Sequence, residues 1–408
     1  MSSSEKDEKK SCCSTLPTFQ TKLKFFFFPA YQIKLTERIY SPCVDWPKTI
    51  IGGVTFLTGI IMLWKYAPID RAIDKILPKF NNTGEYSGDF FGEFGNVSPE
   101  NNEEDTKPTY PFMQCKKDRE CCNGMDICDL RVDEILYATS HNAMATLDDG
   151  FLFGTNHRFG LEGALEAGYR GINLDLCNCG GIHVFCHGHC YLGSRDVVDV
   201  FTAINAFLDK FPSEVLMIPI EINDSADQPI VLHEFHRQMD QVSGFIDKLY
   251  EHDDSSSWPT LRQSVESNKR VFMFHSKGPD CEGSIESCPP GINSYPKYAI
   301  DTEWNFQDLE AIMNIHNSCA LRNNIAITNQ VFFGINSFVV PASQEISQEL
   351  NSLRFARERI NACSQLVGKD PNFIYADFWS EGDLPQLVQE HNIDLARRRL
   401  NRNIRGHA

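Results

Sequence analysis

The strongest constraint on the fold is an alternation of two kinds of segment from residue 135 onward. Short apolar runs of the kind found in β-strands recur at 135–139, 172–176, 183–186, 215–222, 270–275, 298–302, 325–333 and 373–378. Helical periodicity is clearest between and after them, at 196–211, 230–250, 344–367 and 384–390. This alternation predicts an α/β domain, and we expect a distorted (β/α)8 barrel of the TIM type over residues 113–408. An open doubly wound sheet is the alternative, although no glycine-rich dinucleotide-binding loop supports it.

The charge of the chain limits its partners. The formal net charge is −17 at pH 7, whereas nucleic-acid binding needs a basic surface that holds phosphates. We therefore expect no nucleic-acid partner, and any phosphate chemistry has to be local to a pocket.

The cysteines indicate an oxidising compartment. Of fifteen cysteines, only Cys12, Cys13 and Cys43 precede residue 48, and the other twelve follow residue 112. An even number in one region favours a disulfide-bonded domain, whose pairing the sequence does not define. Zinc is the competing interpretation, because Cys177, Cys179, Cys186 and Cys190 have the spacing of four thiolate ligands.

An uncharged segment near the N-terminus predicts a membrane anchor. Residues 49–64 carry no charge and lie between Lys48 and Lys65, with a tryptophan close to each end. The segment is shorter than the ~20 residues usually needed to span a bilayer, but flanking lysines and tryptophans tolerate a modest mismatch. A buried core helix is the alternative. We expect a transmembrane signal-anchor helix at 48–66. An N-terminal tail precedes it at 1–47, and a flexible acidic stalk follows it at 67–112.

The orientation of this anchor follows from the cysteines and the glycosylation sequons. Basic residues are balanced across the segment, so the positive-inside rule does not decide. The twelve cysteines and the sequons at Asn81, Asn96 and Asn223 all lie on the C-terminal side. We therefore expect a single-pass glycoprotein with a cytosolic N-terminus and a lumenal or extracellular main domain.

Two histidines directly follow strand-like runs. The run 135–139 leads into His141, and the run 183–186 leads into His187. Cleavage of a phosphodiester by an internal hydroxyl needs one imidazole to take the proton of the attacking hydroxyl and another to protonate the leaving oxygen. An ordinary imidazole pKa of ~6.5 allows the two rings to hold opposite protonation states near neutrality.

Amide and carboxylate groups accompany these histidines. Asn173 and Asp175 stand two apart in a strand-like run, which places both side chains on one face. Glu221 lies near the end of the run 215–222. Polar groups at the C-terminal ends of parallel strands are typical of the active site of an α/β barrel.

Several motifs resemble the X domain of the phosphatidylinositol-specific phospholipase C family. They are Ser140-His141-Asn142-Ala143, Arg170-Gly-Ile-Asn173-Leu-Asp175, Cys186-His187-Gly188-His189 and Pro219-Ile-Glu221. The run 372–379, followed by Gly382-Asp383-Leu384, resembles the closing strand of the wider phospholipase-C-like phosphodiesterases. The cysteine motifs at 122–128 and 186–190 are similar to those of the secreted, disulfide-bearing branch. The resemblance covers most of residues 113–400.

The resemblance implies a catalytic pair. In that family the histidine of the first motif and the histidine that precedes a glycine act together, which implies His141 and His187, with His189 as a weaker alternative for the second. A buried aspartate on the last strand orients the first histidine in bacterial members, and Asp377 stands at the matching position. A carboxylate in this place also has a physical role, because it fixes the tautomer of an imidazole and stabilises its cation.

The resemblance also implies a Ca²⁺ site. Asn142, Asp175 and Glu221 match ligands of the calcium-dependent enzymes, whereas Asn173 stands where those enzymes have a glutamate. Ca²⁺ takes six to eight oxygen ligands, so the loss of one carboxylate would weaken binding or favour Mg²⁺. Buried ion pairs of Asp175 and Glu221 with Arg170 or a lysine are the alternative, and a metal-free site stays open.

These predictions describe a membrane-anchored phosphoric diester hydrolase of the phospholipase C type. The expected substrate is a phosphatidylinositol-type lipid or a glycosyl-phosphatidylinositol at a membrane surface. One alternative is a phosphodiesterase for another glycero- or sphingo-phosphodiester, and a second is a catalytically inactive barrel used as a binding module. The candidates for substrate contacts are Arg170, His275, Lys277, Glu303 and Trp304.

Overall fold

The computed structural model describes residues 121–406, except 152, 224–228, 278–287, 325–326 and 328–329. The expected tail, transmembrane helix and stalk lie outside the described residues, as do the sequons at Asn81 and Asn96. Within the described part of the chain, no helix combines the length and the apolar character that a membrane span requires.

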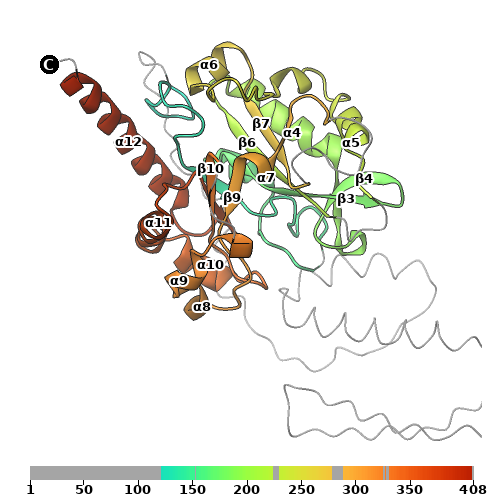
Figure 1. Cartoon of the computed structure of the whole chain (residues 1–408). Helices are drawn as coiled ribbons and strands as arrows, with labels where there is room; N and C mark the ends of the chain where they lie inside the picture. Colours follow the sequence, from blue (N-terminus) through green and yellow to red (C-terminus); the bar gives the residue numbers. More distant parts are fainter. Residues whose placement is uncertain are drawn as a thin grey trace, which may run out of the picture. The chain divides into compact units, whose positions relative to one another are not determined.

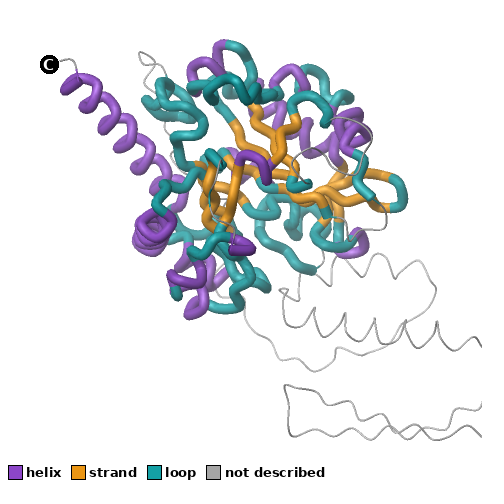
Figure 2. The backbone as a smooth tube through the Cα atoms, viewed as in Figure 1, coloured by secondary structure: helices purple, strands orange, loops and turns teal. Residues whose placement is uncertain are grey.

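A single sheet forms the centre of the domain, with helices around it (Figure 1, Figure 2). Its parallel strands follow the order β9–β10–β11–β1–β2–β6–β7–β8, and β3 continues the line of β2 beside β6. The bounds of the strands are β1 Tyr137–Ser140, β2 Gly171–Ile172, β3 Leu174–Cys179, β4 Ile182–Cys186, β5 Ser194–Asp196, β6 Leu216–Ile222, β7 Val271–His275, β8 Ile292–Ser294, β9 Ala299–Asp301, β10 Phe332–Asn336 and β11 Phe373–Ala376.

The expected α/β class and parallel strands are confirmed, but the sheet does not close into a complete barrel. Among the described strands β8 and β9 do not pair with each other, so the sheet stays open at this seam. Each of the two strands has three residues, and the four-residue helix α7 (Tyr295–Tyr298) joins them directly. Such short strands leave few backbone groups with which to close a ladder.

The strand expected at 183–186 also has a different role. It is β4, which pairs antiparallel with β3 and then with β5, so it is the returning arm of a hairpin and not a parallel strand of the barrel. The two residues between β3 and β4 are Gly180 and Gly181, with φ of 64° and 93°. Two-residue hairpin turns of this kind need positive φ at both positions, which glycine adopts without steric cost.

Side chains alternate between the two faces of the sheet. Leu216 and Ile218 of β6 pack with Val271 and Met273 of β7 in a core cluster shared with helices on that face. Val215 and Met217 instead join Phe272, Phe274, Phe332 and Phe373 in a second, largely aromatic cluster on the other face. Figure 1 shows α4 and α5 beside β6 and β7. The second cluster therefore fills the inside of the curved sheet.

The helices match the periodicity in position more than in length. Their bounds are α3 Leu161–Glu166, α4 Val197–Lys210, α5 Leu232–Met239, α6 Leu261–Glu266, α7 Tyr295–Tyr298, α8 Leu309–Met313, α9 Ile315–Ser318, α10 Gln344–Leu350, α11 Leu353–Val367 and α12 Leu384–Gly406. The helix expected over 230–250 ends at Met239, and Gly244 with φ of 74° lies in the turn that follows. The helix expected over 344–367 is two helices, because Ser352 caps α11 through a hydrogen bond from the backbone N–H of Phe355.

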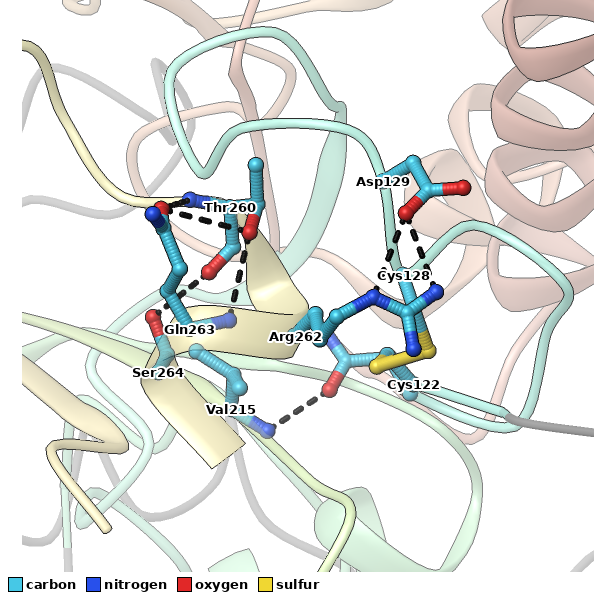
Figure 3. The surroundings of a disulfide bond; sticks show 9 residues. Cys122, Cys128, Asp129, Val215, Thr260, Arg262, Gln263 and Ser264 are labelled. Atoms are coloured by element: carbon cyan, nitrogen blue, oxygen red, sulfur yellow. Dashed lines mark hydrogen bonds and ion pairs between the residues drawn. A yellow bond between two sulfur atoms is a disulfide. The ribbon is translucent and has the colours of Figure 1, made fainter. Parts of the chain in front are cut away.

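Disulfides connect many of the described cysteines. The pairs are Cys122–Cys128, Cys177–Cys186, Cys179–Cys190 and Cys319–Cys363, and Cys121 and Cys288 are also disulfide-bonded. The predicted disulfides are thus confirmed, and the zinc alternative is wrong, because each of its four sulfur atoms is bonded to another sulfur. The first pair lies at the N-terminal end of β6, where Asn123 accepts a hydrogen bond of 2.7 Å from the backbone N–H of Val215 (Figure 3).

Candidate active site

The C-terminal ends of the neighbouring strands β1 and β11 bring a histidine and an aspartate together. His141 follows β1 and Asp377 follows β11, and the two strands pair in parallel. Nδ1 of His141 lies 2.9 Å from Oδ1 of Asp377, whose side chain is 1% exposed. A carboxylate can only accept here, so Nδ1 carries the proton and Nε2 is left as a base. The pair therefore has the geometry of a general base held by a buried carboxylate.

The ring of His141 is also held from its face. It stacks on Phe338, with ring centroids 3.8 Å apart and an interplanar angle of 9°. Phe338 is buried and follows β10, the strand on the other side of β11. An imidazolium formed in this position would gain cation–π stabilisation. The stack and the hydrogen bond to Asp377 together fix the ring plane.

His187 reaches the same edge of the sheet from the β3–β4 hairpin. Its Nδ1 lies 2.6 Å from the carbonyl oxygen of Gly154, so this nitrogen donates and Nε2 again carries the lone pair or the transferable proton. The disulfides Cys177–Cys186 and Cys179–Cys190 bracket the segment that contains His187. The side-chain amide of Asn223 donates a hydrogen bond of 2.9 Å to the carbonyl of the next residue, Gly188.

The pKa of His187 depends on the other charged groups of the site. Burial lowers the pKa of His187, and the positive charge of His141 lowers it further. The hydrogen bond to Gly154 and the carboxylates of Asp377 and Glu221 raise the same pKa in part. His187 is therefore close enough to His141, Asp377 and Glu221 for their charges to affect its pKa.

Asp175 and Glu221 lie directly opposite each other on β3 and β6. Side chains at paired positions of parallel strands point to the same face. Burial raises the pKa of Asp175 well above its ordinary value, and the nearby carboxylate of Glu221 raises it further. Oδ1 of Asp175 is buried and has no hydrogen-bond partner among the described residues. Two adjacent carboxylates with an unsatisfied buried oxygen fit a hard cation such as Ca²⁺.

Asn142 and Asn173 lie between this acidic pair and the His141–Asp377 pair, which we call the dyad. Asn142 follows His141 in a left-handed conformation, with φ of 49°. Oδ1 of Asn173 accepts a hydrogen bond of 3.0 Å from the backbone N–H of Asn142, and its Nδ2 lies 3.3 Å from the carbonyl of Pro219. Asn173 thus supports the loop that carries His141. Its oxygen keeps a second lone pair, so the residue remains compatible with a cation ligand.

Other candidate residues lie away from this group. Arg170 precedes β2, at the opposite end of the strand, and binds Glu214 at 2.5 Å, so it is not the ion-pair partner of Asp175 or Glu221. His275 pairs with Ile220, on the face of β7 opposite to Glu221. His189 is exposed and stacks on Tyr191.

The remaining candidates follow β7 and β9 at the same edge of the sheet as the dyad. Lys277 lies 3.4 Å from the carbonyl of Ile230. Glu303 accepts a hydrogen bond from the backbone N–H of Asn323, and Arg322 lies over the ring of Trp304.

The sequence interpretation missed several residues of the site. Asn156 contacts Asp377, and His157 contacts the backbone of His141. Phe338 stacks on His141, and Asn223 holds the loop that carries His187. Asn223 was identified only as a glycosylation sequon. None of these side chains continues a strand or helix pattern, so periodicity gave no signal for them.

The site can carry acid–base chemistry on a phosphate ester. Two imidazoles, each fixed through Nδ1, leave two Nε2 atoms that can take and give protons. Asn142, Asn173, Asp175 and Glu221 are the residues that could hold a divalent cation through oxygen atoms.

Comparison with known proteins identifies related sequences. The sequence model of the PI-PLC X 1 family matches residues 127–392. A curated relative, PI-PLC X domain-containing protein 1 of the fungus Arthroderma benhamiae, is 22% identical over 289 residues, which cover 66% of this chain and 89% of the relative.

Solved structures of bacterial enzymes show a similarity at low sequence identity. Phosphatidylinositol-specific phospholipase C from Listeria monocytogenes is 14% identical, with a TM-score of 0.45. The superposition covers 67% of this chain and 99% of that enzyme. A phosphatidylinositol-specific phospholipase C of Staphylococcus aureus is 13% identical, with a TM-score of 0.46. The superposition covers 66% of this chain and 95% of that enzyme.

Proposed function

This chain belongs to the PI-PLC X 1 family, and we propose that it is a phosphoric diester hydrolase that cleaves a phosphatidylinositol-type lipid or a glycosyl-phosphatidylinositol. The observation that carries the proposal is the hydrogen bond of 2.9 Å between His141 and the buried Asp377, with a second histidine, His187, near enough for both of them to affect its pKa. Family membership supports the reaction class, and the names of the bacterial relatives motivate the choice of lipid.

In the proposed mechanism His141 is the general base. Its Nε2 takes the proton from a hydroxyl next to the phosphate, and that hydroxyl oxygen attacks phosphorus. Asp377 stabilises the imidazolium that forms, because its carboxylate already accepts the proton on Nδ1. The ring of Phe338 adds to this stabilisation through its stacking contact.

His187 is the proposed general acid. Its Nδ1–H is held by the carbonyl of Gly154, which leaves Nε2 as the nitrogen that can donate a proton to the substrate. The proton on Nε2 passes to the oxygen of the leaving diacylglycerol as the ester bond to phosphorus breaks. The products are a cyclic inositol phosphate and a diacylglycerol. Substrates with a hydroxyl adjacent to the phosphate are therefore required, as in inositol lipids.

A divalent cation is the proposed cofactor. Asn142, Asp175 and Glu221 would hold it, with Asn173 as a fourth oxygen donor. We propose Ca²⁺, with Mg²⁺ as the alternative, because all four side chains offer oxygen atoms, the ligands that both hard cations take. When bound, such an ion neutralises the negative charge that develops on phosphate. The buried and unpartnered Oδ1 of Asp175 supports this proposal.

The proposed location is the lumenal or extracellular side of a membrane. The disulfides of the described domain support an oxidising compartment. On that side of the membrane, glycosyl-phosphatidylinositols and outer-leaflet lipids are more accessible substrates than cytosolic signalling lipids. We further propose that residues 48–66 anchor the enzyme at this surface.

The substrate class is tested with the full-length protein, expressed through an oxidising secretory pathway and assayed with Ca²⁺ and with chelator. The substrates are vesicles of phosphatidylinositol, a glycosyl-phosphatidylinositol-anchored protein, and vesicles of phosphatidylcholine or sphingomyelin. We expect head-group release from the inositol-containing substrates only. Release from sphingomyelin alone would redirect the proposal to another phosphodiester, and no release from any substrate by a folded protein would contradict an enzymatic role.

A further inference from the structure

We propose that Asn156 and His157 form a positioning pair that fixes the His141–Asp377 dyad for general-base catalysis. This inference rests on the proposed function, since it assigns the two residues to the reaction of that site. Both side chains are buried, with exposed fractions of 3% and 1%. They lie in the loop between His141 and α3, and we assign neither of them a proton-transfer step.

Asn156 holds the carboxylate. Its Nδ2 donates a hydrogen bond of 2.8 Å to Oδ1 of Asp377, the same oxygen that accepts the proton of His141. Oδ2 of Asp377 has no hydrogen-bond partner among the described residues. One oxygen thus receives both donors, and Asn156 prevents the carboxylate from rotating away from the imidazole.

His157 holds the backbone on both sides of the dyad. Its Nε2 lies 2.6 Å from the carbonyl oxygen of His141, and its Nδ1 lies 3.2 Å from the backbone nitrogen of Trp379. A carbonyl only accepts and a backbone N–H only donates, so the ring is neutral with its proton on Nε2. Burial lowers the pKa of His157 to about 4, so this neutral form persists near neutrality. His157 therefore connects residue 141 with residue 379 through one rigid ring.

The backbone of the dyad requires such support. Asn142 and Phe378, the residues directly after His141 and Asp377, have φ of 49° and 46°. Side chains other than glycine rarely adopt this left-handed region, and surrounding contacts have to stabilise it. The carbonyl of Asn156 accepts a hydrogen bond of 2.7 Å from the backbone N–H of Phe378. The pair thus stabilises the strained turn that aims Asp377 at His141.

A matched control is available at the other end of the same strands. Asn372 is also 3% exposed, and its side chain joins the backbone just before β1 and the backbone of β10 to the start of β11. Replacing Asn372 by alanine removes a comparable set of buried hydrogen bonds far from the dyad. An effect that Asn156→Ala and Asn372→Ala share reflects lost stability, whereas an effect of Asn156→Ala alone reflects the dyad.

The test uses full-length protein in detergent and records two quantities. The first is the low-field proton resonance of the hydrogen bond between His141 and Asp377, assigned by its loss in His141→Ala and Asp377→Asn. The second is kcat and KM on phosphatidylinositol. The variants are Asn156→Ala, His157→Phe, His157→Gln and Asn372→Ala. Glutamine can keep one donor and one acceptor, whereas phenylalanine keeps only the ring shape.

We expect the resonance to shift or broaden in Asn156→Ala and His157→Phe and to persist in His157→Gln and Asn372→Ala. We expect kcat to fall about tenfold to a hundredfold in the first two variants with KM nearly unchanged, the size associated with a lost hydrogen bond to a charged group. An unchanged resonance in both folded variants overturns the inference, as does its absence from the wild type. If the wild type has no activity, the proposed function fails while the resonance still tests the pair.

Discussion

Nδ1 of His141 and Oδ1 of Asp377 lie 2.9 Å apart although 236 residues separate them in the chain. The parallel pairing of β1 and β11 makes this contact, because Ser140 is opposite Ala376 and each active residue comes next. The hydrogen bond is thus a direct product of strand register. A shift of β11 by one residue would turn Asp377 to the opposite face.

Replacement of Asp377 by asparagine tests the carboxylate of this dyad. An amide cannot stabilise the imidazolium and can present a donor to the wrong tautomer. We therefore expect kcat to fall about a thousandfold to ten-thousandfold, by analogy with the same change in the Ser-His-Asp triad of serine proteases. The measurement is steady-state hydrolysis of phosphatidylinositol. The control is Asp370→Asn, an exposed aspartate near the other end of β11. Retention of more than a tenth of the wild-type rate by Asp377→Asn would argue against the assigned role.

The pH dependence tests the role of His187. A general acid has to be protonated, and burial lowers the pKa of His187 below its ordinary value of ~6.5 despite the opposing effects of Gly154, Asp377 and Glu221. We therefore expect kcat/KM to decline as the pH rises through a value below about 6.5. The rate is measured from pH 4.5 to 8.5, with circular dichroism at each pH as the control for folding. A rate that stays maximal up to pH 8 is incompatible with His187 as the acid.

We expect the hairpin disulfides to matter more for activity, and Cys319–Cys363 to matter more for stability. Removing Cys177–Cys186 and Cys179–Cys190 frees the segment that carries His187, so we expect a large loss of kcat. The control, Cys319→Ser with Cys363→Ser, opens a loop of 44 residues, against 9 and 11 for the hairpin pairs.

By loop entropy the control costs about 4 kcal/mol of unfolding free energy, and each hairpin pair costs about 3 kcal/mol. Serine variants of either hairpin pair should therefore lose less unfolding free energy than the control and yet lose more activity. Denaturant unfolding and kcat are measured in parallel. Equal activity losses in the control and in a hairpin variant would show that the disulfides act only through stability.

The acidic pair predicts an inverted effect of one substitution. Asp175→Asn removes the repulsion between two adjacent carboxylates, so without a cation the variant should have a higher melting temperature than the wild type. With Ca²⁺ at about a hundred times its dissociation constant, the wild type should gain about 3 kcal/mol and the variant much less. Differential scanning calorimetry with chelator and with Ca²⁺ measures both effects. A wild type that is insensitive to Ca²⁺ and to Mg²⁺ would remove the cation from the proposal.

His157 contributes a pH-dependent stability whose sign is defined. Its pKa is about 4 in the folded protein and ~6.5 when unfolded, so the unfolded state binds the extra proton between these values. The contribution is complete above pH 6.5 and is lost as the pH falls toward 4, by up to about 3 kcal/mol. His157→Gln cannot titrate, so the stability difference between wild type and variant should fall over this interval. A difference that stays constant with pH would mean that His157 is protonated or accessible in the folded state.

Much of the site could be predicted because its residues follow strands. His141 and Asp377 directly follow β1 and β11, and Asp175 and Glu221 lie one residue before the ends of the apolar runs 172–176 and 215–222. Parallel strands bring such ends to one edge. The same rule explains why Arg170 does not join them. It precedes β2, so it lies at the opposite edge, where it binds Glu214.

Other features were beyond a reading of local pattern. His275 ends an apolar run too, but alternation along β7 places it on the face shared with Val271 and Met273, and the sequence does not define which face is inward. Asn156 and His157 depend on partners 221 and 222 residues away, which no local period encodes. The open seam follows from the shortness of β8 and β9, a property that depends on tertiary pairing.

The most direct test of the central claim is the identity of the first product. Phosphorus NMR follows full-length protein acting on phosphatidylinositol, with His141→Ala and His187→Ala measured at equal concentrations of folded protein. The account predicts that a cyclic inositol phosphate accumulates first with the wild type and is lost with both variants. Direct formation of the open inositol phosphate, or a cyclic product that persists in His141→Ala, would contradict internal attack assisted by this pair of histidines.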